Sequence, residues 1–350
     1  MSTLLEAKAI PLTHGRLPRQ APLLVGIVSL ALSALIGLLL SWGPLEIGVV
    51  TLVLFCSVLP MWSAIIENRR AAVDRLVTSL IWTAFGVAVI PLVWLIWVVI
   101  SNGASAINPQ FLTYSMRNVI GDDQGGVYHA LIGTLLITLA AALISVPVGI
   151  FAAIYLVEYG KGSRLGRAIT FLVDVMTGIP SIVAGLFALS LFVLIFGPAI
   201  RIGFAGSVAL SLLMIPTVVR SSEEMFRLVP DELREAAYAL GVPKWRTIVK
   251  VVLPTSLGGV ITGVVLAISR VIGETAPLLV VAGSIDSVNT NLFHDRMMTL
   301  PVFIFNQYST STPEGYERAW GGALVLIAIV MVLNLLARLI GKFFAPKTGR

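Results

Sequence analysis

The sequence is poor in the residues from which most enzyme sites are built. Its 350 residues include one cysteine and three histidines, and only 12% are charged. Cys56 stands alone in an apolar run, which excludes a disulfide within the chain. His14, His129 and His294 are far apart, and no Ser-His-Asp or Cys-His arrangement is suggested. We therefore expect no catalytic residues, no metal ligands and no bound cofactor.

Two recognition motifs are also missing. The chain has no Gly-x-x-x-x-Gly-Lys-Ser/Thr segment that could hold the phosphates of ATP, so it cannot hydrolyse ATP by itself. Neither an aromatic and basic platform nor a zinc spacing accompanies its net charge of +6. Nucleic acid is therefore not an expected partner.

Apolar residues are abundant instead. They make up 57% of the chain, whose mean hydropathy of +0.95 leaves too little polar surface for a soluble protein of this length. The sequence therefore predicts an all-α fold, a polytopic transmembrane helix bundle in a lipid bilayer, with about eight spans of roughly 20 residues or more. The uncharged runs that qualify are 22–43, 47–66, 77–101, 128–157, 175–200, 202–222, 255–283 and 319–341.

Basic residues gather in alternate connections. One group is Lys8, Arg16, Arg19, Arg69, Arg70, Arg75, Lys161, Arg164, Arg167, Arg227, Arg234, Lys244, Arg246, Lys250, Arg338, Lys342, Lys347 and Arg350. The opposite connections hold only Arg117, Arg201, Arg296 and Arg318. Because cytoplasmic loops carry the excess of Lys and Arg, both termini should lie in the cytoplasm of a multi-pass protein of the cytoplasmic membrane.

The most informative motif follows the sixth predicted span. It reads Glu235-Ala236-Ala237, three residues, Gly241, nine residues, then Val251-x-Leu253-Pro254. Asp231 and Glu232 suit the first turn of a helix that Gly241 would end. Pro243 can occupy the first turn of a second helix over 244–252.

This predicted helix-turn-helix has an apolar tip. Tyr238, Leu240, Val242 and Trp245 lie around its turn, where they could fit a groove of a partner protein. The alternative is a merely solvated loop with helical character.

Glycine and proline interrupt the spans from Tyr128 onward. The segment 178–181 (Gly-Ile-Pro-Ser) with Gly185 breaks one predicted span, and Pro216 interrupts the next. Such breaks either permit rearrangement of helix halves or are ordinary kinks that only shape the bundle. We expect this half of the chain to hold the transport path.

Three ionisable residues fall at membrane depth. Arg270 and Glu274, four residues apart, are predicted to share one helical face, and Arg220 lies near the cytoplasmic end of the preceding span. Such charges usually serve a substrate, a partner charge or a water path, and a guanidinium suits an oxyanion such as phosphate. The alternatives are an ion pair between Arg270 and Glu274 and an Arg220 that reaches the interface beside Glu223. Asp174 is expected to be interfacial.

The motif from Glu235 to Pro254, called the coupling motif below, resembles the EAA loop of bacterial importer permeases driven by ATP-binding cassette (ABC) proteins. Over about residues 128–342 the chain looks like the PstA family of phosphate-importer permeases. The segments that carry this resemblance are 220–230, 233–241, 267–279 and 300–305. Val251 departs from the usual Ile of the motif.

The resemblance implies a type I ABC importer permease core. The N-terminal two-helix hairpin over 22–66 is an addition, because it exceeds the six spans expected for the family. The resemblance also implies a homologous PstC-type permease, two ATPase subunits that bind ATP and Mg, and an extracytoplasmic phosphate-binding protein as partners. By the same resemblance, the substrate path contains Arg220, Arg270 and Glu274. The implied ATPase contacts are Glu235, Ala236, Ala237, Leu240, Gly241, Val242, Leu253 and Pro254.

The predicted organisation begins with a cytoplasmic tail and two-span hairpin over 1–70. A further span and an extracytoplasmic loop follow over 71–127, then the permease core over 128–342. The coupling loop lies at about 223–254, and 343–350 form a cytoplasmic tail. Three other functions stay open: a permease for sulfate or molybdate, a proton-coupled secondary transporter, and a non-transporting membrane sensor.

Overall fold

The computed structural model describes residues 15–119, 125–198 and 200–344, and these residues form helices without a strand. Lys8, Lys347 and Arg350, which belong to the larger group of basic residues, lie outside the described residues. The chain divides into two compact units, Met1–Trp97 and Val98–Arg350. Each unit forms its own core and is described by itself.

The first unit contains the predicted hairpin. Helices α1 (Ala21–Leu40) and α2 (Pro44–Ile66) are joined by a minimal turn, and a proline lies in the first turn of each. Small residues on α1, among them Ser33 and Gly37, are buried and allow α2 to approach closely. Helix α3 (Arg69–Gly103) begins in this unit and ends in the next.

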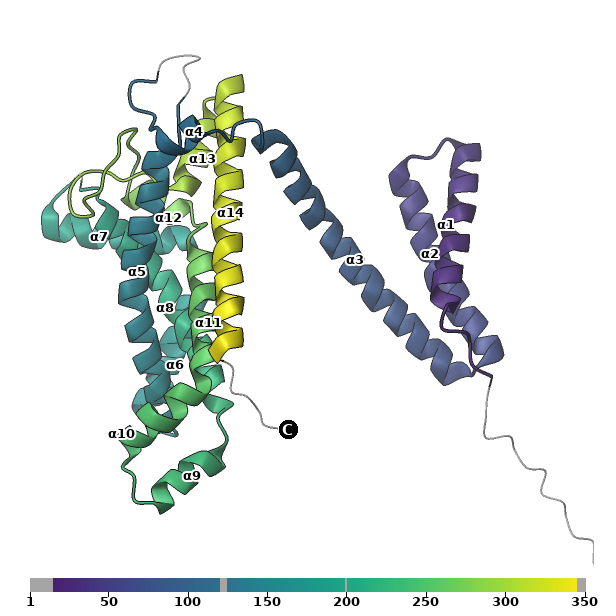
Figure 1. Cartoon of the computed structure of the whole chain (residues 1–350), viewed down its shortest axis with the longest axis horizontal. Helices are drawn as coiled ribbons and strands as arrows, with labels where there is room; N and C mark the ends of the chain where they lie inside the picture. The colour runs from purple at the N-terminus through teal and green to yellow at the C-terminus, as the bar shows by residue number, and fades with distance from the viewer. Residues whose placement is uncertain (1–14, 120–124, 199, 345–350) are drawn as a thin grey trace, which may run out of the picture. The chain divides into compact units, whose positions relative to one another are not determined.

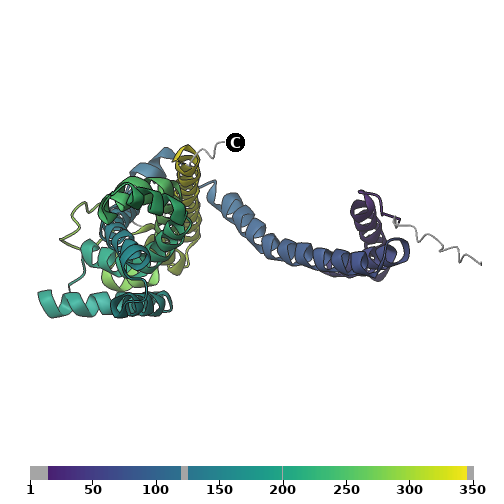
Figure 2. The same cartoon turned by 90° about the horizontal axis from the view of Figure 1, so that it is seen from below.

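The second unit is a helix bundle, drawn from blue through teal to yellow in Figure 1 and seen nearly end-on in Figure 2. Its helices are α4 (Pro109–Thr113), α5 (Tyr128–Ile154), α6 (Arg164–Thr177), α7 (Ser181–Phe196), α8 (Gly203–Arg227), α9 (Asp231–Ala239), α10 (Lys244–Thr247), α11 (Leu253–Val271), α12 (Ala276–Val281), α13 (Leu300–Ser309) and α14 (Pro313–Phe344). Two π-helical turns, η1 (Tyr155–Tyr159) and η2 (Ile248–Val252), extend α5 and precede α11.

Helix α8 forms the centre of this bundle. It has the largest buried share among the candidate spans and packs against α5, α7 and α11. Leu210, Met214 and Val218 of α8 are fully buried in a core that also includes Ile137 and Phe303.

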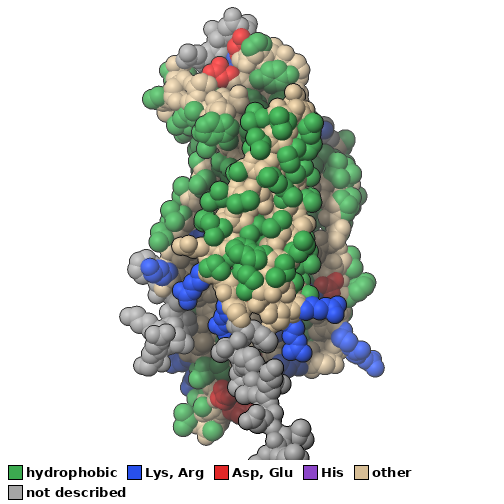
Figure 3. All heavy atoms as spheres, turned by 90° about the vertical axis from the view of Figure 1, so that its right-hand side faces the viewer, with side chains coloured by type: hydrophobic (Ala, Val, Ile, Leu, Met, Phe, Trp, Pro, Cys, Tyr) green, Lys and Arg blue, Asp and Glu red, His purple; other side chains and the backbone are tan. Residues whose placement is uncertain are grey.

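Seven described helices are long and apolar enough to cross a membrane, and the count is eight if α6 and α7 form one span. Figure 3 shows hydrophobic side chains spread over the upper and middle parts of the visible face and Lys and Arg side chains gathered in its lower part, as expected where helices face lipid and end at its surface. The prediction of an all-α bundle with about eight spans is confirmed.

Two predicted spans are not single straight helices. The run 175–200 is divided at the predicted break, where α6 and α7 meet at a bend of 109°. The run 255–283 ends as a helix at Val271, and the short α12 follows. Pro277 explains this interruption, because in a continuous helix it would have no N–H to donate to the carbonyl of Gly273 and its ring would clash with that carbonyl; it lies instead in the first turn of α12.

Candidate functional site

A polar cavity of about 240 Å³ lies where the broken span meets α8 and the end of α11. The break contributes Ile179 and Ser181, α8 contributes Pro216 and Thr217, and the end of α11 contributes Arg270. The complete lining is Met176, Thr177, Ile179, Ser181, Leu213, Pro216, Thr217, Arg270 and Glu274. The predicted break at 178–181 therefore lines this cavity together with Pro216. The predicted interruption at Pro216 was wrong, because α8 is continuous from Gly203 to Arg227.

The break also directs the start of a helix toward this cavity. Helix α7 begins at Ser181, and its N-cap residue, Pro180, supplies no side-chain hydrogen bond. The first backbone N–H groups of a helix have no intrahelical acceptor and carry a partial positive charge. The cavity thus combines a helix N-terminus with the Arg270 guanidinium, an arrangement that favours an anion.

Arg270 and Glu274 share the cavity, but they do not share a helical face. Arg270 is exposed in the last turn of α11, and Glu274 follows the helix end in a turn, where its N–H donates to Val271. Neither side chain forms a hydrogen bond or ion pair with another described residue. The prediction of one face was wrong because α11 ends before Glu274, and the alternative of a closed ion pair is not what the structure shows.

Arg220 lies outside the cavity. Its guanidinium pairs with Asp174 of α6 and, at 3.0 Å, with Glu223 of α8. Thr217, one helical turn away, lines the cavity, so this ionic cluster borders the polar space. The structure therefore brings Arg270 and Glu274 together in one cavity. The third predicted path residue, Arg220, forms ion pairs with two carboxylates instead.

The coupling motif forms a helix-turn-helix at one end of the second unit (Figure 1). Gly241 has a φ of +74°, which favours glycine, and its N–H donates to the carbonyl of Tyr238. Leu240 and Trp245 project from the turn, with 84% and 58% of their surface exposed. The predicted helix-turn-helix and its apolar tip are confirmed.

The second helix of the motif does not end at Val252. It continues through η2 into α11, so that one helical rod runs from Lys244 to Val271. Of the predicted contact residues, Glu235, Ala236, Leu240, Gly241 and Pro254 are exposed, Val242 and Leu253 are half-buried, and Ala237 is buried. A displacement of the tip would act directly on the rod that carries Arg270.

A buried arginine that sequence reasoning missed anchors this motif. Only 8% of Arg234 is exposed, and its Nε donates to Glu158 Oε1 of η1 at 3.0 Å. Its terminal nitrogens donate to the carbonyls of Phe226 and Val229 and to Asp231. Every nitrogen of the guanidinium is therefore used.

Lys244 reinforces the same junction. Its ammonium donates to the backbone carbonyl of Glu158 and lies 4.8 Å from the centre of the Tyr159 ring. The sequence does signal an Asp231–Arg234 pair by its spacing of three. Nothing in it indicates Glu158, which is 76 residues away from Arg234.

Comparison with known proteins places these features in a family. Residues 145–350 match the family described as "Binding-protein-dependent transport system inner membrane component". The chain is 49% identical over 284 residues to "Phosphate transport system permease protein PstA 1" of Mycobacterium tuberculosis (strain ATCC 25618 / H37Rv), covering 81% of this chain and 91% of that protein. It is 41% identical over 283 residues to "Phosphate transport system permease protein PstA" of Yersinia pestis, with coverage of 80% and 91%.

A solved structure shares the fold at low sequence identity. It is a chain of a bacterial alginate ABC transporter in complex with an alginate pentasaccharide-bound periplasmic protein. The TM-score is 0.56 at 14% identity, and the match covers 79% of this chain and 97% of that one.

Proposed function

The chain belongs to the family of binding-protein-dependent transport system inner membrane components, and we propose that it is the PstA-type permease subunit of an ATP-driven inorganic phosphate importer. Its all-helical architecture is that of type I ABC importer permeases. The observation that carries the proposal is the cavity that joins Arg270, Glu274 and the N-terminus of α7.

The donor set of this cavity suits a tetrahedral oxyanion. Arg270 offers a planar fork of N–H groups, and Ser181 and Thr217 offer hydroxyls, whereas the Thr177 hydroxyl donates to the carbonyl of Val173. A charged side chain at membrane depth costs at least about 2.5–3.5 kcal/mol, and an anionic ligand would offset part of this cost.

Glu274 favours phosphate over sulfate. An ionised carboxylate can only accept hydrogen bonds, and it repels an anion that has no proton to donate. Hydrogen phosphate carries a P–OH at neutral pH, whereas sulfate does not. A site built to bond a substrate hydroxyl discriminates strongly against an analogue without one, so Glu274 would disfavour sulfate.

Coupling to ATP follows from the rod between the helix-turn-helix and the cavity. The exposed tip at Leu240 and Trp245 would dock in a groove of a separate ATPase subunit. Closing of the ATPase dimer would then move the rod that ends at Arg270, so that access to the cavity alternates between the two sides of the membrane. A second permease would supply the rest of the site, and an extracytoplasmic binding protein would deliver phosphate.

The test is uptake of labelled phosphate into proteoliposomes that contain the complete transporter and its binding protein. We expect ATP-dependent uptake in wild type and its loss in Arg270→Gln. Arg338→Gln, which removes an exposed arginine at the far end of α14, is the matched control and should transport normally. An intact Arg270→Gln complex with the wild-type rate would contradict the assigned site.

Other readouts separate the remaining functions. Glu274→Gln should lower the preference for phosphate over sulfate. Uptake of sulfate or molybdate by wild type in place of phosphate would reassign the substrate. Flux without ATP would indicate a secondary transporter, and signalling without flux would indicate a sensor.

A further inference from the structure

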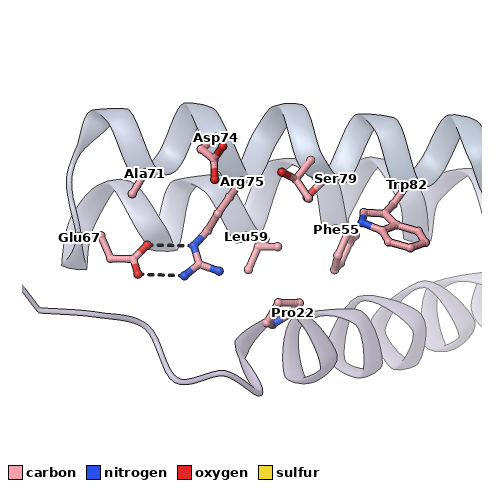
Figure 4. Close-up of a pocket in the computed structure, with 10 residues that line it drawn as sticks. Pro22, Phe55, Leu59, Glu67, Ala71, Asp74, Arg75, Ser79 and Trp82 are labelled. Atoms are coloured by element: carbon pink, nitrogen blue, oxygen red, sulfur yellow. Dashed lines mark hydrogen bonds and ion pairs between the residues drawn. The ribbon is translucent and has the colours of Figure 1, made fainter. Parts of the chain in front are cut away.

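A second cavity, of about 520 Å³, lies entirely within the first unit. Residues of α1, α2 and α3 surround it, together with Glu67 from the connection between α2 and α3 (Figure 4). Its lining is Pro22, Phe55, Leu59, Glu67, Ala71, Asp74, Arg75, Thr78, Ser79 and Trp82. Charged groups gather at one end, and aromatic and aliphatic groups at the other.

The charged end contains a saturated carboxylate. Arg75 donates to both oxygens of Glu67 at 2.9 Å, and Ser63 Oγ and the Leu17 N–H donate to them as well. These bonds, with that from Arg75 the largest cause, lower the pKa of Glu67 to about 2. Glu67 is therefore ionised at neutral pH and has its accepting capacity largely occupied.

Two groups at this end are still available to a ligand. Arg75 uses Nε and Nη2 for Glu67, and its Nη1 forms no hydrogen bond with a described residue. The carboxylate of Asp74 is exposed and likewise forms no hydrogen bond with a described residue. The cavity thus offers one donor and one anionic acceptor on adjacent residues.

The cavity is in a membrane protein, so a lipid is a possible ligand, and the charges of the lining decide which kind of lipid headgroup can bind. Glu67 and Asp74 are acidic and Arg75 is the one base of the lining, so the cavity carries a net negative charge. A zwitterion can place its cation at Asp74 and its phosphate at Arg75, whereas a headgroup without a cation offers nothing to Asp74. The basic residues predicted to face the cytoplasm place this end at headgroup depth.

We propose that this cavity binds a zwitterionic aminophospholipid, with phosphatidylethanolamine as the fitting chemical class. Its ammonium pairs with Asp74, and its phosphate accepts from Nη1 of Arg75. The glycerol and the first acyl methylenes lie against Phe55, Leu59 and Trp82, which form the apolar end. The site lies outside the transport cavity and does not depend on the function proposed above.

The experiment uses the full transporter in nanodiscs of equal phosphatidylethanolamine and phosphatidylglycerol with identical acyl chains. Lipids retained after detergent extraction are counted by native mass spectrometry. We expect wild type to retain mainly phosphatidylethanolamine and Asp74→Asn to retain about tenfold less, because the variant loses the charge-assisted hydrogen bond to the ammonium. Glu46→Gln changes an acid of the same unit outside the lining and should behave as wild type.

Thermal unfolding provides an independent readout. Phosphatidylethanolamine should raise the melting temperature of wild type and of Glu46→Gln, but not that of Asp74→Asn. Asp74 is exposed, so the variant should fold without it. Equal retention of the two lipids by wild type, a preference for phosphatidylglycerol, or unchanged retention by Asp74→Asn would each overturn the proposal.

Discussion

A single buried guanidinium ties the coupling helices to the rest of the bundle. Arg234 donates to Glu158, to Asp231 and to two backbone carbonyls, so that α9 is held against η1 and the end of α8. An ammonium is compact and cannot reproduce this fork.

We expect Arg234→Lys to destabilise the protein by about 2–4 kcal/mol, because it leaves a buried carboxylate and carbonyls without donors. Thermal unfolding of the purified complex measures this change. Arg227→Lys, at an exposed arginine that pairs with Glu223, is the control and should shift stability by less than about 1 kcal/mol. Equal stability of the two variants would show that the Arg234 network contributes little.

Gly241 tests whether the shape of the turn matters for coupling. Its φ of +74° costs a non-glycine residue about 1–2 kcal/mol, yet a Cβ added at this position would meet no atom within 4 Å. Gly241→Ala should therefore alter the turn by backbone strain alone and reduce phosphate uptake per ATP hydrolysed.

Gly162 provides the matched control for this prediction. It has a φ of +76° and equally open surroundings, but it lies between η1 and α6. Gly162→Ala should lose similar stability and keep the wild-type ratio of uptake to hydrolysis. Gly241→Asn, whose side chain tolerates the left-handed region, should recover most of the coupling.

At the scale of elements, prolines, glycines and acidic residues near helix ends correctly predicted where several helices begin and end. The helix-turn-helix follows from Pro243, Gly241 and the acidic first turn of α9, and the break of the fifth span follows from Pro180. The early end of α11 has a local cause in Pro277, although the predicted span 255–283 overlooked it. The 109° bend did not follow from the sequence, because a proline indicates a break and not its angle, and α7 packs against α12 beyond the break. Glu158 could not be found either, since its partner comes from a distant element.

The contact between α7 and α12 depends on one glycine. A Cβ on Gly185 would lie 2.6 Å from Cα of Pro277, a backbone atom that cannot move aside. We expect Gly185→Ala to destabilise the complex by about 1–3 kcal/mol through overpacking and to reduce uptake, because α7 lines the cavity through Ser181.

Gly86→Ala is the control for this substitution, since it also lies inside a helix but has nothing within 4 Å of its Cβ. It should unfold at or above the wild-type temperature, as alanine is the better helix former. A Gly185→Ala protein that unfolds at the same temperature as Gly86→Ala would contradict the packing argument.

At the scale of the whole molecule, charge and connectivity together decide how the bent pair α6–α7 crosses the membrane. The connection at Lys161 and the coupling helices are both predicted to be cytoplasmic. The elements between them, the bent pair and α8, must then cross twice in total. Because α8 crosses once, the bent pair must also cross once, and a re-entrant loop would leave the coupling helices on the wrong side.

The connection between α7 and α8 supports a single crossing of the membrane by the bent pair. The N–H of Phe204, at the start of α8, donates to the carbonyl of Leu292 at 2.7 Å. Arg201 therefore lies beside the connection between α12 and α13, which is predicted to be extracytoplasmic.

Cysteine labelling measures this arrangement directly, because Cys56→Ser removes the only native thiol. In that background we expect Arg201→Cys to react with a membrane-impermeant maleimide from the extracytoplasmic side. Lys161→Cys, an exposed position at the other end of α6, should react only from the cytoplasmic side. If α6 and α7 instead formed a re-entrant loop, both cysteines would react from the same side. That result would also require the coupling helices to lie opposite Lys161, where no cytoplasmic ATPase could reach them.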